Sequence, residues 1–364
     1  MKILLVGGGS GGPVAPLLAV AAAIKRHHSR AEFLLLGTKF GPERQMAAAA
    51  EIEFMEIPAG KWRRYFSLKN LTTPFEVLAG FFAARKIIKR FEPDCVFGAG
   101  GFAQVPVVWA AKFAKIPSVI HQQDLQASLA NRLCQSAATL ITVSFADSQA
   151  EFSSGSGLFY KKNKSKVVLA GNPFRESLAS ANKQDGVRLF DLKEDLPTLL
   201  VLGGGTGSQY LNSLITSNLK VLTKYVQIIH ATGANKGSVT SQDNYYSADF
   251  IDNMGAAYAA ADVVLCRAGL STITELSNLG KVAIVVPLLG THQEFNAYFL
   301  FRSQAAIVFD QSELSGPILV KTLRRLLFER ELQENLKRNI SKIMPKNSTQ
   351  KIADLIIKLS ETTQ

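Results

Sequence analysis

The sequence contains few cysteines, and none of them is placed to form a disulfide framework or a metal site. Cys95, Cys134 and Cys266 are the only three in 364 residues, and each lies far from the others among apolar residues. Isolated cysteines of this kind are typical of reduced thiols in the core of a cytosolic protein. We therefore expect neither disulfides nor a bound metal ion to hold this fold together.

Long apolar segments are also missing. The longest uninterrupted ones, such as 15–24 and 105–111, fall well short of the roughly 20 residues that a membrane-spanning helix needs. The first apolar run gives way to glycine at Gly7, too early for the apolar core of a secretory signal. The sequence therefore predicts a cytoplasmic protein without a membrane span.

Acidic side chains are scarce relative to basic ones. There are 29 Asp and Glu residues against 41 Lys and Arg residues, which gives a formal net charge of +12. Such a surplus predicts an acidic partner: a nucleic acid, an anionic membrane surface or a phosphorylated substrate. Hydrophobic residues make up 47% of the chain, which excludes intrinsic disorder, and the length predicts two domains.

The sequence does contain a strand-and-helix alternation that occurs twice. A glycine-rich turn follows the first strand of each half, at 7–12 and at 203–207. Short buried strands separated by helices indicate parallel sheets. The predicted fold class is α/β, with two Rossmann-like domains facing a central cleft: residues 1–172, on which a C-terminal helix within 346–364 packs back, and residues 173–345. The predicted strands are 2–6, 32–36, 95–97, 118–121, 139–143, 167–169, 198–202, 226–230, 262–266, 282–286 and 306–309.

The glycine turns indicate binding of phosphate groups. Gly7, Gly9 and Gly12 match G-x-G-x-x-G directly after a strand. NAD would also call for an acidic residue at the end of the second strand, where the sequence reads Leu36-Gly37-Thr38, and there is no Walker motif. We predict a phosphate or diphosphate near one loop or both. The alternative is tight strand-to-helix packing without a ligand.

A denser polar cluster follows a strand of the second half, at 267–275. The amides of 270–273 and the hydroxyls of Ser271 and Thr272 can hold a diphosphate at a helix N-terminus, and Glu275 can accept hydrogen bonds from a ribose. An ordinary capping box explains the same residues equally well. About twenty residues later, His292, Gln293 and Asn296 follow another strand, a placement that suits recognition of sugar hydroxyls.

Together these motifs resemble the MurG family of UDP-N-acetylglucosamine:lipid I N-acetylglucosaminyltransferases, over essentially the whole chain. Their order and their placement at strand ends are far more specific than any single glycine motif. The matching segments are the first glycine loop with Pro16, then 100–102, 121–124 (His-Gln-Gln-Asp), 171–175 (Gly-Asn-Pro-Phe-Arg), 203–207, 250–254, 267–275 and 292–297.

The resemblance implies a GT-B glycosyltransferase that needs no cofactor and no metal. Its reaction is the inverting transfer of GlcNAc from UDP-GlcNAc to the MurNAc C4 hydroxyl of lipid I, which forms lipid II for peptidoglycan. In such a protein the second domain holds most of the donor, with uracil near Ile251 and GlcNAc near Gln293. The donor-binding residues expected on this basis are Ser10, Gly11, Gly12, Asp124, Arg175, Gly205, Thr206, Ile251, Leu270, Ser271, Thr272, Ile273, Thr274, Glu275, His292 and Gln293.

The sequence departs from the family's pattern on the acceptor side. Pro13 replaces a histidine at the end of the first loop, Gln122 replaces a glutamate, and Asp124 replaces an asparagine. Proline has no titratable group, so the base must lie elsewhere. Asp124 and His121 are the remaining candidates, and we expect Asp124 to take over part of the missing role. The alternative for Asp124 is that it caps the following helix.

The positive charge is concentrated in one aromatic-rich segment. Residues 61–90 contain eight basic residues and one acidic residue. An apolar patch with a basic rim can dock on an anionic membrane surface, whereas a core-facing helix with a solvated basic face is the ordinary alternative. The predicted patch consists of Trp62, Phe66, Phe75, Leu78, Phe82, Arg85, Lys86 and Lys89.

Together with the resemblance, this basic and aromatic segment predicts a peripheral protein on the cytoplasmic face of the inner membrane. Its expected partners are UDP-N-acetylglucosamine, lipid I and the anionic membrane surface. A nucleic-acid partner is not expected, because no recognition motif is visible. Two other functions stay open: transfer from a UDP-sugar to another lipid such as diacylglycerol, and sugar-nucleotide binding by a catalytically impaired homologue.

Overall fold

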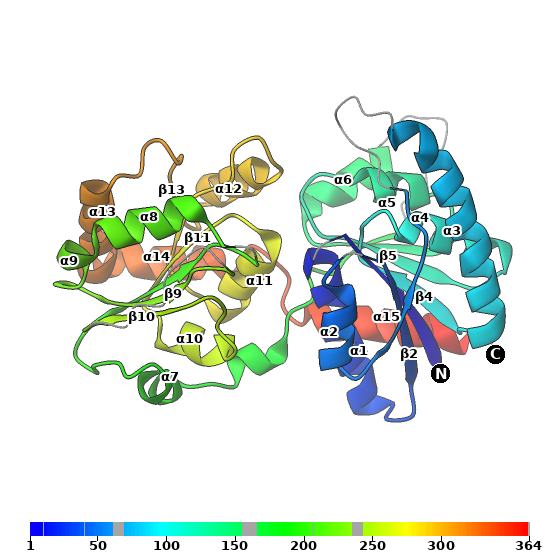
Figure 1. Cartoon of the computed structure of the whole chain (residues 1–364), viewed down its shortest axis with the longest axis horizontal. Coiled ribbons are helices and arrows are strands. Elements are labelled where there is room, and N and C mark those ends of the chain that lie inside the picture. Colours follow the sequence, from blue (N-terminus) through cyan, green and yellow to red (C-terminus); the bar gives the residue numbers. More distant parts are fainter. Residues whose placement is uncertain are drawn as a thin grey trace. The chain divides into compact units, whose positions relative to one another are not determined.

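The computed structural model of the chain describes residues 1–9, 11–39, 41–60, 69–154, 166–205, 207–234 and 243–362. The chain forms two compact units, labelled by element in Figure 1. The first unit is Met1–Phe174 together with Pro345–Gln364, and the second is Arg175–Met344. Among the described residues, no helix is both long enough and apolar enough to span a bilayer.

The first unit is a parallel sheet of seven strands in the order β3-β2-β1-β4-β5-β6-β7. The order reverses direction between β1 and β4, which is the switch point where α/β sheets bind ligands. The strands are β1 (Lys2–Val6), β2 (Glu32–Gly37), β3 (Glu53–Glu56), β4 (Cys95–Gly98), β5 (Ser118–Gln122), β6 (Leu140–Val143) and β7 (Val167–Leu169). The helices are α1 (Gly11–His27), α2 (Glu43–Ala49), α3 (Lys69–Phe91), α4 (Gln104–Phe113), α5 (Leu129–Cys134), α6 (Ala146–Ser154) and α15 (Ser348–Glu361).

The second unit repeats this plan with six parallel strands in the order β10-β9-β8-β11-β12-β13, reversing between β8 and β11. The strands are β8 (Thr198–Leu202), β9 (Gln227–Ala231), β10 (Tyr245–Ala248), β11 (Val263–Cys266), β12 (Ala283–Val285) and β13 (Ile307–Val308). The helices are η2 (Glu176–Ala179, a 3₁₀ helix), α7 (Lys183–Leu189), α8 (Gln209–Ser217), α9 (Leu219–Leu222), α10 (Met254–Ala260), α11 (Leu270–Leu279), α12 (Gln293–Arg302), α13 (Gly316–Phe328) and α14 (Arg330–Ile340).

The prediction of two parallel-sheet, Rossmann-like domains is confirmed. Two strands, β3 and β10, are absent from the predicted set. Each is an edge strand of four residues, and each contains polar residues, as in Glu53-Phe-Met-Glu56. Because an edge strand is covered less completely than a central one, its sequence is not the continuous apolar run by which the other strands were predicted.

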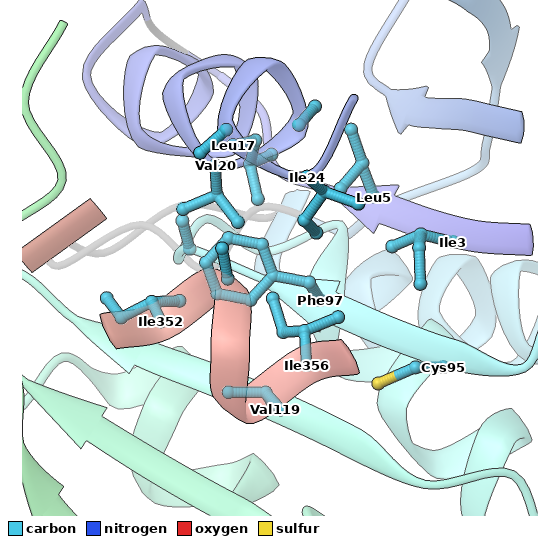
Figure 2. Packing of buried hydrophobic residues seen from close by; sticks show 14 of the residues in the cluster. Ile3, Leu5, Leu17, Val20, Ile24, Cys95, Phe97, Val119, Ile352 and Ile356 are labelled. Carbon is cyan, nitrogen blue, oxygen red and sulfur yellow. The ribbon is translucent and has the colours of Figure 1, made fainter. Parts of the chain in front are cut away.

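The C-terminal helix α15 helps to close the core of the first unit. Its Ile352 and Ile356 are fully buried against Phe97 of β4 and Leu17 of α1, as Figure 2 shows. The Thr349 hydroxyl accepts a hydrogen bond from the Phe174 amide (2.8 Å) and donates one to the Phe174 carbonyl (2.9 Å). Since burial of one isoleucine side chain contributes about 1.5–3 kcal/mol, these contacts hold the end of the chain firmly to the unit where it began.

Candidate functional site

The N-terminus of α11 lies at the carboxyl end of β11, beside the switch point of the second sheet. Its N-cap is Gly269, which provides no capping side chain, and the first helical hydrogen bond runs from the Ile273 amide to the Gly269 carbonyl (3.0 Å). The amides of residues 270–272 therefore have no partner within the helix. A Cβ placed on Gly269 would meet no atom within 4 Å. This open, positive helix end suits a diphosphate.

The capping-box alternative for this segment is wrong. A capping box needs a Ser or Thr at the N-cap and an acidic residue at the third helical position. Here the N-cap is a glycine, Ser271 and Thr272 are the second and third helical residues, and Glu275 is the sixth. Ser271 and Thr272 are only partly buried, so their hydroxyls remain accessible next to the unpaired amides.

Two residues predicted to hold the donor face the interior instead. The Ile273 side chain is 1% exposed and its amide belongs to the helix. Thr274 is 2% exposed, and its hydroxyl donates to the Leu270 carbonyl (2.8 Å). The structure therefore contradicts their predicted donor contacts. An α-helix has 3.6 residues per turn, so when residues 271, 272 and 275 lie on the exposed face, residues 273 and 274 lie on the face toward the core.

Glu275 is held between two side chains at the carboxyl ends of the strands. Its Oε2 accepts a hydrogen bond from the Tyr258 hydroxyl (2.7 Å), and its Oε1 lies 3.3 Å from the Arg175 guanidinium. Burial raises the pKa of Glu275, and both partners oppose that rise. Each carboxylate oxygen has more than one acceptor site, so Glu275 can still receive ribose hydroxyls. Arg175 was predicted here, whereas Tyr258 was not, because it lies in an alanine-rich helix without a motif.

Ile251 was predicted to lie near uracil, and it is buried, with only 3% of the residue exposed. Its neighbour Phe250, 70% exposed, offers an aromatic face that the sequence did not predict as a ligand contact. Gly205 is exposed, and a Cβ on it would meet no atom within 4 Å. Ser10 and Thr206 lie outside the described residues.

The polar cluster at the start of α12 is only partly directed to solvent. His292 is exposed and immediately precedes the helix, while Gln293 accepts a hydrogen bond from the Leu288 amide (3.1 Å). Asn296 is buried and donates to the Ala268 carbonyl (3.1 Å). This bond ties α12 to the turn before α11, so Asn296 positions the site while His292 and Gln293 remain available to a sugar.

A carboxyl group from helix α2 lies against the glycine loop of the first unit. Glu43 of α2 is fully buried, and its Oε1 accepts hydrogen bonds from the Gly9 amide (2.5 Å) and the Thr38 hydroxyl (2.9 Å). Pro13, the third residue of α1, has no amide to offer. A carboxyl group that already accepts the Gly9 amide and a proline without an amide leave this loop with fewer donors for an anion. Phosphate binding is therefore expected in the second unit, while Gly11 and Gly12 of the first unit remain partly exposed.

His121 is sealed inside the first sheet. It is fully buried on β5, with Nδ1 3.0 Å from the Thr142 hydroxyl and Nε2 2.9 Å from Asn172 Oδ1. Desolvation by burial lowers the pKa of His121 to about 4, against weaker opposing hydrogen bonds. The prediction of His121 as a base is contradicted, because neither ring nitrogen can reach a substrate hydroxyl. It is a structural residue of the sheet.

Gln122 organises the loop that contains Asp124. Its Nε2 donates to the carbonyls of Asp124 (2.8 Å) and Gln126 (2.7 Å), and its Oε1 accepts from the Ser128 amide (3.1 Å). An ionised glutamate could not donate these bonds. Asp124 is partly exposed in this loop, and the N-cap of the following helix α5 is Ser128, which accepts from the Asn131 amide. The capping alternative for Asp124 is therefore wrong.

An exposed apolar surface lies along α3 and α4. Phe75, Leu78 and Phe82 are 74%, 53% and 58% exposed, whereas Ala84, Ile87 and Ile88 of the same helix point into the core. Leu78 lines a shallow groove of about 380 Å³ together with Phe113 of α4, which is 68% exposed and was not predicted. We call this surface the α3–α4 patch. Arg85, Lys86 and Lys89 are exposed on α3, while Trp62 and Phe66 lie outside the described residues.

The chain matches two family models in succession. The glycosyltransferase family 28 N-terminal domain matches residues 3–143, and the family 28 C-terminal domain matches residues 198–356. A protein of Clostridium botulinum (strain Langeland) named UDP-N-acetylglucosamine--N-acetylmuramyl-(pentapeptide) pyrophosphoryl-undecaprenol N-acetylglucosamine transferase is 35% identical over 99% of each chain. A Thermoanaerobacter protein with the same name is 31% identical over 98% of this chain and 99% of its own.

Solved structures show the same likeness. The structure of Acinetobacter baumannii MurG has a TM-score of 0.73 at 26% identity, covering 98% of this chain and 99% of that one. The calicheamicin glycosyltransferase CalG4 has a TM-score of 0.70 at 14% identity over 98% of each chain, which concerns the fold alone.

Proposed function

This chain belongs to glycosyltransferase family 28, and from that premise we propose how its two units share the reaction. The reaction is the transfer of GlcNAc from UDP-GlcNAc to lipid-linked N-acetylmuramyl-pentapeptide, which makes lipid II. The observation that supports this function most strongly is the sequence similarity to the named transferase of Clostridium botulinum over 99% of both chains. The second unit is the proposed donor site, and the first unit receives the acceptor.

The second unit offers one group for each part of the donor. The unpaired amides of residues 270–272 and the hydroxyls of Ser271 and Thr272 face the diphosphate. Glu275, oriented by Tyr258 and Arg175, accepts the ribose hydroxyls. The ring of Phe250, next to the buried Ile251, is available to uracil, and His292 and Gln293 are available to the GlcNAc hydroxyls.

In the transfer, the C4 hydroxyl oxygen of MurNAc forms a bond to C1 of GlcNAc while the bond from C1 to the diphosphate oxygen breaks. UDP leaves with the electron pair, and its developing negative charge is met by the amides at the N-terminus of α11. The hydroxyl proton passes to a base, for which we propose Asp124. Attack opposite to the leaving group inverts the configuration at C1.

A direct assay tests this function and separates it from the two alternatives. Radiolabelled UDP-GlcNAc incubated with a lipid I analogue is expected to place label in lipid II and to release one UDP per transfer. Label in diacylglycerol but not in the lipid I analogue contradicts the assigned acceptor. Binding of UDP-GlcNAc without transfer to any acceptor indicates a catalytically impaired homologue.

Membrane docking is the second part of the proposal. The α3–α4 patch exposes large apolar side chains on a face that the core does not use, and Arg85, Lys86 and Lys89 lie on the same helix. A core-facing helix would have buried these aromatic residues. Each basic residue near an anionic membrane surface contributes about 1 kcal/mol to the free energy of membrane binding. Each apolar side chain that leaves water on binding makes this free energy more favourable. This arrangement suits a peripheral protein that collects a lipid-linked acceptor at the cytoplasmic surface of the membrane.

The double variant Phe75→Ser, Phe82→Ser is expected to weaken binding to vesicles of mixed anionic and neutral lipid by about ten- to a hundredfold, because two rings no longer leave water. Co-sedimentation measures this. The matched control is Phe328→Ser, which changes a phenylalanine of the second unit that is 77% exposed. Replacing Arg85, Lys86 and Lys89 with Gln is expected to remove the preference for anionic lipid. Equal loss in the Phe328 control, or equal wild-type binding to neutral vesicles, contradicts docking through this patch.

A further inference from the structure

Arg267 is a buried guanidinium at the carboxyl edge of the second sheet. It directly follows β11, and it precedes the first residue of α11 by three positions. Its side chain bonds to three segments: Nε donates to the Ser208 hydroxyl (3.1 Å), Nη1 to the carbonyls of Val286 (3.2 Å) and Pro287 (3.0 Å), and Nη2 to Gln311 Oε1 (2.9 Å). These segments follow β8, β12 and β13, so Arg267 joins the loops that surround the proposed diphosphate position.

All of these acceptors are neutral. Arg267 is 8% exposed, and in the described part of the chain no carboxylate lies within ion-pair distance of it. The guanidinium also lies over the ring of Tyr210, whose centroid is 5.7 Å from the guanidinium carbon. Buried charges in proteins are normally paired, because desolvation of an ion is expensive. A guanidinium remains protonated even where burial lowers its pKa, as it does here.

The first unit has the opposite arrangement at the equivalent loop. There the buried side chain beside the glycine turn is the carboxylate of Glu43, which accepts the Gly9 amide. In the second unit the buried side chain bonded to Ser208, directly after the glycine turn, is a cation. The buried side chain near the glycine turn is thus a hydrogen-bond acceptor in the first unit and a guanidinium in the second, and the guanidinium favours an anion.

We propose that Arg267 is a positioning residue whose fixed positive charge is balanced by the diphosphate of the sugar nucleotide. This proposal rests on the donor site proposed above. Arg267 does not itself contact the ligand in this arrangement: it holds the loops and supplies a charge behind the α11 amides. Its charge acts on the diphosphate alone, so uracil and ribose recognition are independent of it.

The experiment compares the affinities of UDP and uridine by calorimetry in Arg267→Met and in the wild type. The affinity for UDP is expected to fall about ten- to a hundredfold, while that for uridine stays within about threefold. In Arg267→Met, the affinity for UDP should also fall less steeply with increasing ionic strength than it does in the wild type. The matched control is Gln311→Leu, which removes a neutral partner of the same guanidinium and keeps the charge. It is expected to leave the UDP-to-uridine ratio unchanged.

A purely structural role would lower both affinities equally in Arg267→Met, and that result overturns the proposal. Arg267→Lys retains the charge without the forked geometry, so it must keep the UDP-to-uridine ratio within about threefold of the wild type. If the methionine variant does not fold, the lysine variant decides. A UDP-to-uridine affinity ratio that falls to one in Arg267→Lys overturns the proposal, and a ratio that stays near the wild-type value supports it. Failure of the wild type to bind UDP at all would instead reject the donor site itself.

Discussion

Replacement of Asp124 with Asn is expected to reduce the turnover of GlcNAc transfer to a lipid I analogue by about a hundred- to ten-thousandfold, the usual contribution of a general base. Asp124 is partly exposed on the loop after β5, and Gln122 fixes the backbone at its carbonyl. His121, the other candidate, is fully buried and has both ring nitrogens engaged. Pro13 cannot accept a proton. Asp124 is therefore the base that we propose for the acceptor's proton.

The kinetic constants distinguish the two roles predicted for Asp124. Loss of a base lowers kcat and leaves the KM for UDP-GlcNAc unchanged, whereas loss of a donor contact raises that KM. The matched control is Asp147→Asn, which changes an exposed carboxylate of the same unit in the first turn of α6. Near-normal turnover of the Asp124 variant, or an equal loss in the Asp147 control, would refute the assignment of the base.

Replacement of Glu275 with Ala is expected to lower kcat/KM for UDP-GlcNAc by about ten- to a hundredfold for each ribose hydroxyl bond lost, since hydrogen bonds to a charged group contribute about 1.5–3 kcal/mol. Glu275 is 15% exposed, so its bonds to a ligand are only weakly screened by water. The replacement also leaves the buried Tyr258 hydroxyl without its partner, and a moderate fall in Tm is expected with it.

The matched control for Glu275 is Tyr258→Phe, which removes the same internal hydrogen bond and retains the carboxylate. Affinities for UDP and for 2′,3′-dideoxy-UDP provide the decisive measurement. The wild type and Tyr258→Phe should prefer UDP, while Glu275→Ala should bind both nucleotides equally. A Glu275 variant that still prefers UDP would show that the ribose is recognised elsewhere.

Two of the three departures from the family pattern have physical explanations in the structure. Pro13 occupies the first turn of α1, where its fixed φ is well tolerated. Gln122 is buried and donates two hydrogen bonds that an ionised glutamate could not donate. Asp124 is not the cap of the next helix, because Ser128 has that role. Two of these changes are thus accommodated by the local backbone, and the third leaves a partly exposed acid for chemistry.

The sequence by itself determined the two Rossmann-like units, the glycine turns and the helix start at α11 where we propose that the diphosphate binds. These features depend on short-range patterns: buried strands are continuous apolar runs, and tight turns require glycine. The tertiary structure alone decided which side chains can act. His121 and Thr274 matched motifs but are buried. No role was expected for Glu43, Tyr258 and Arg267, which form hydrogen bonds to Gly9, Glu275 and Ser208 respectively. Burial, hydrogen-bond partners and the sign of a buried charge depend on residues far apart in the chain, and these become neighbours only when the sheets assemble.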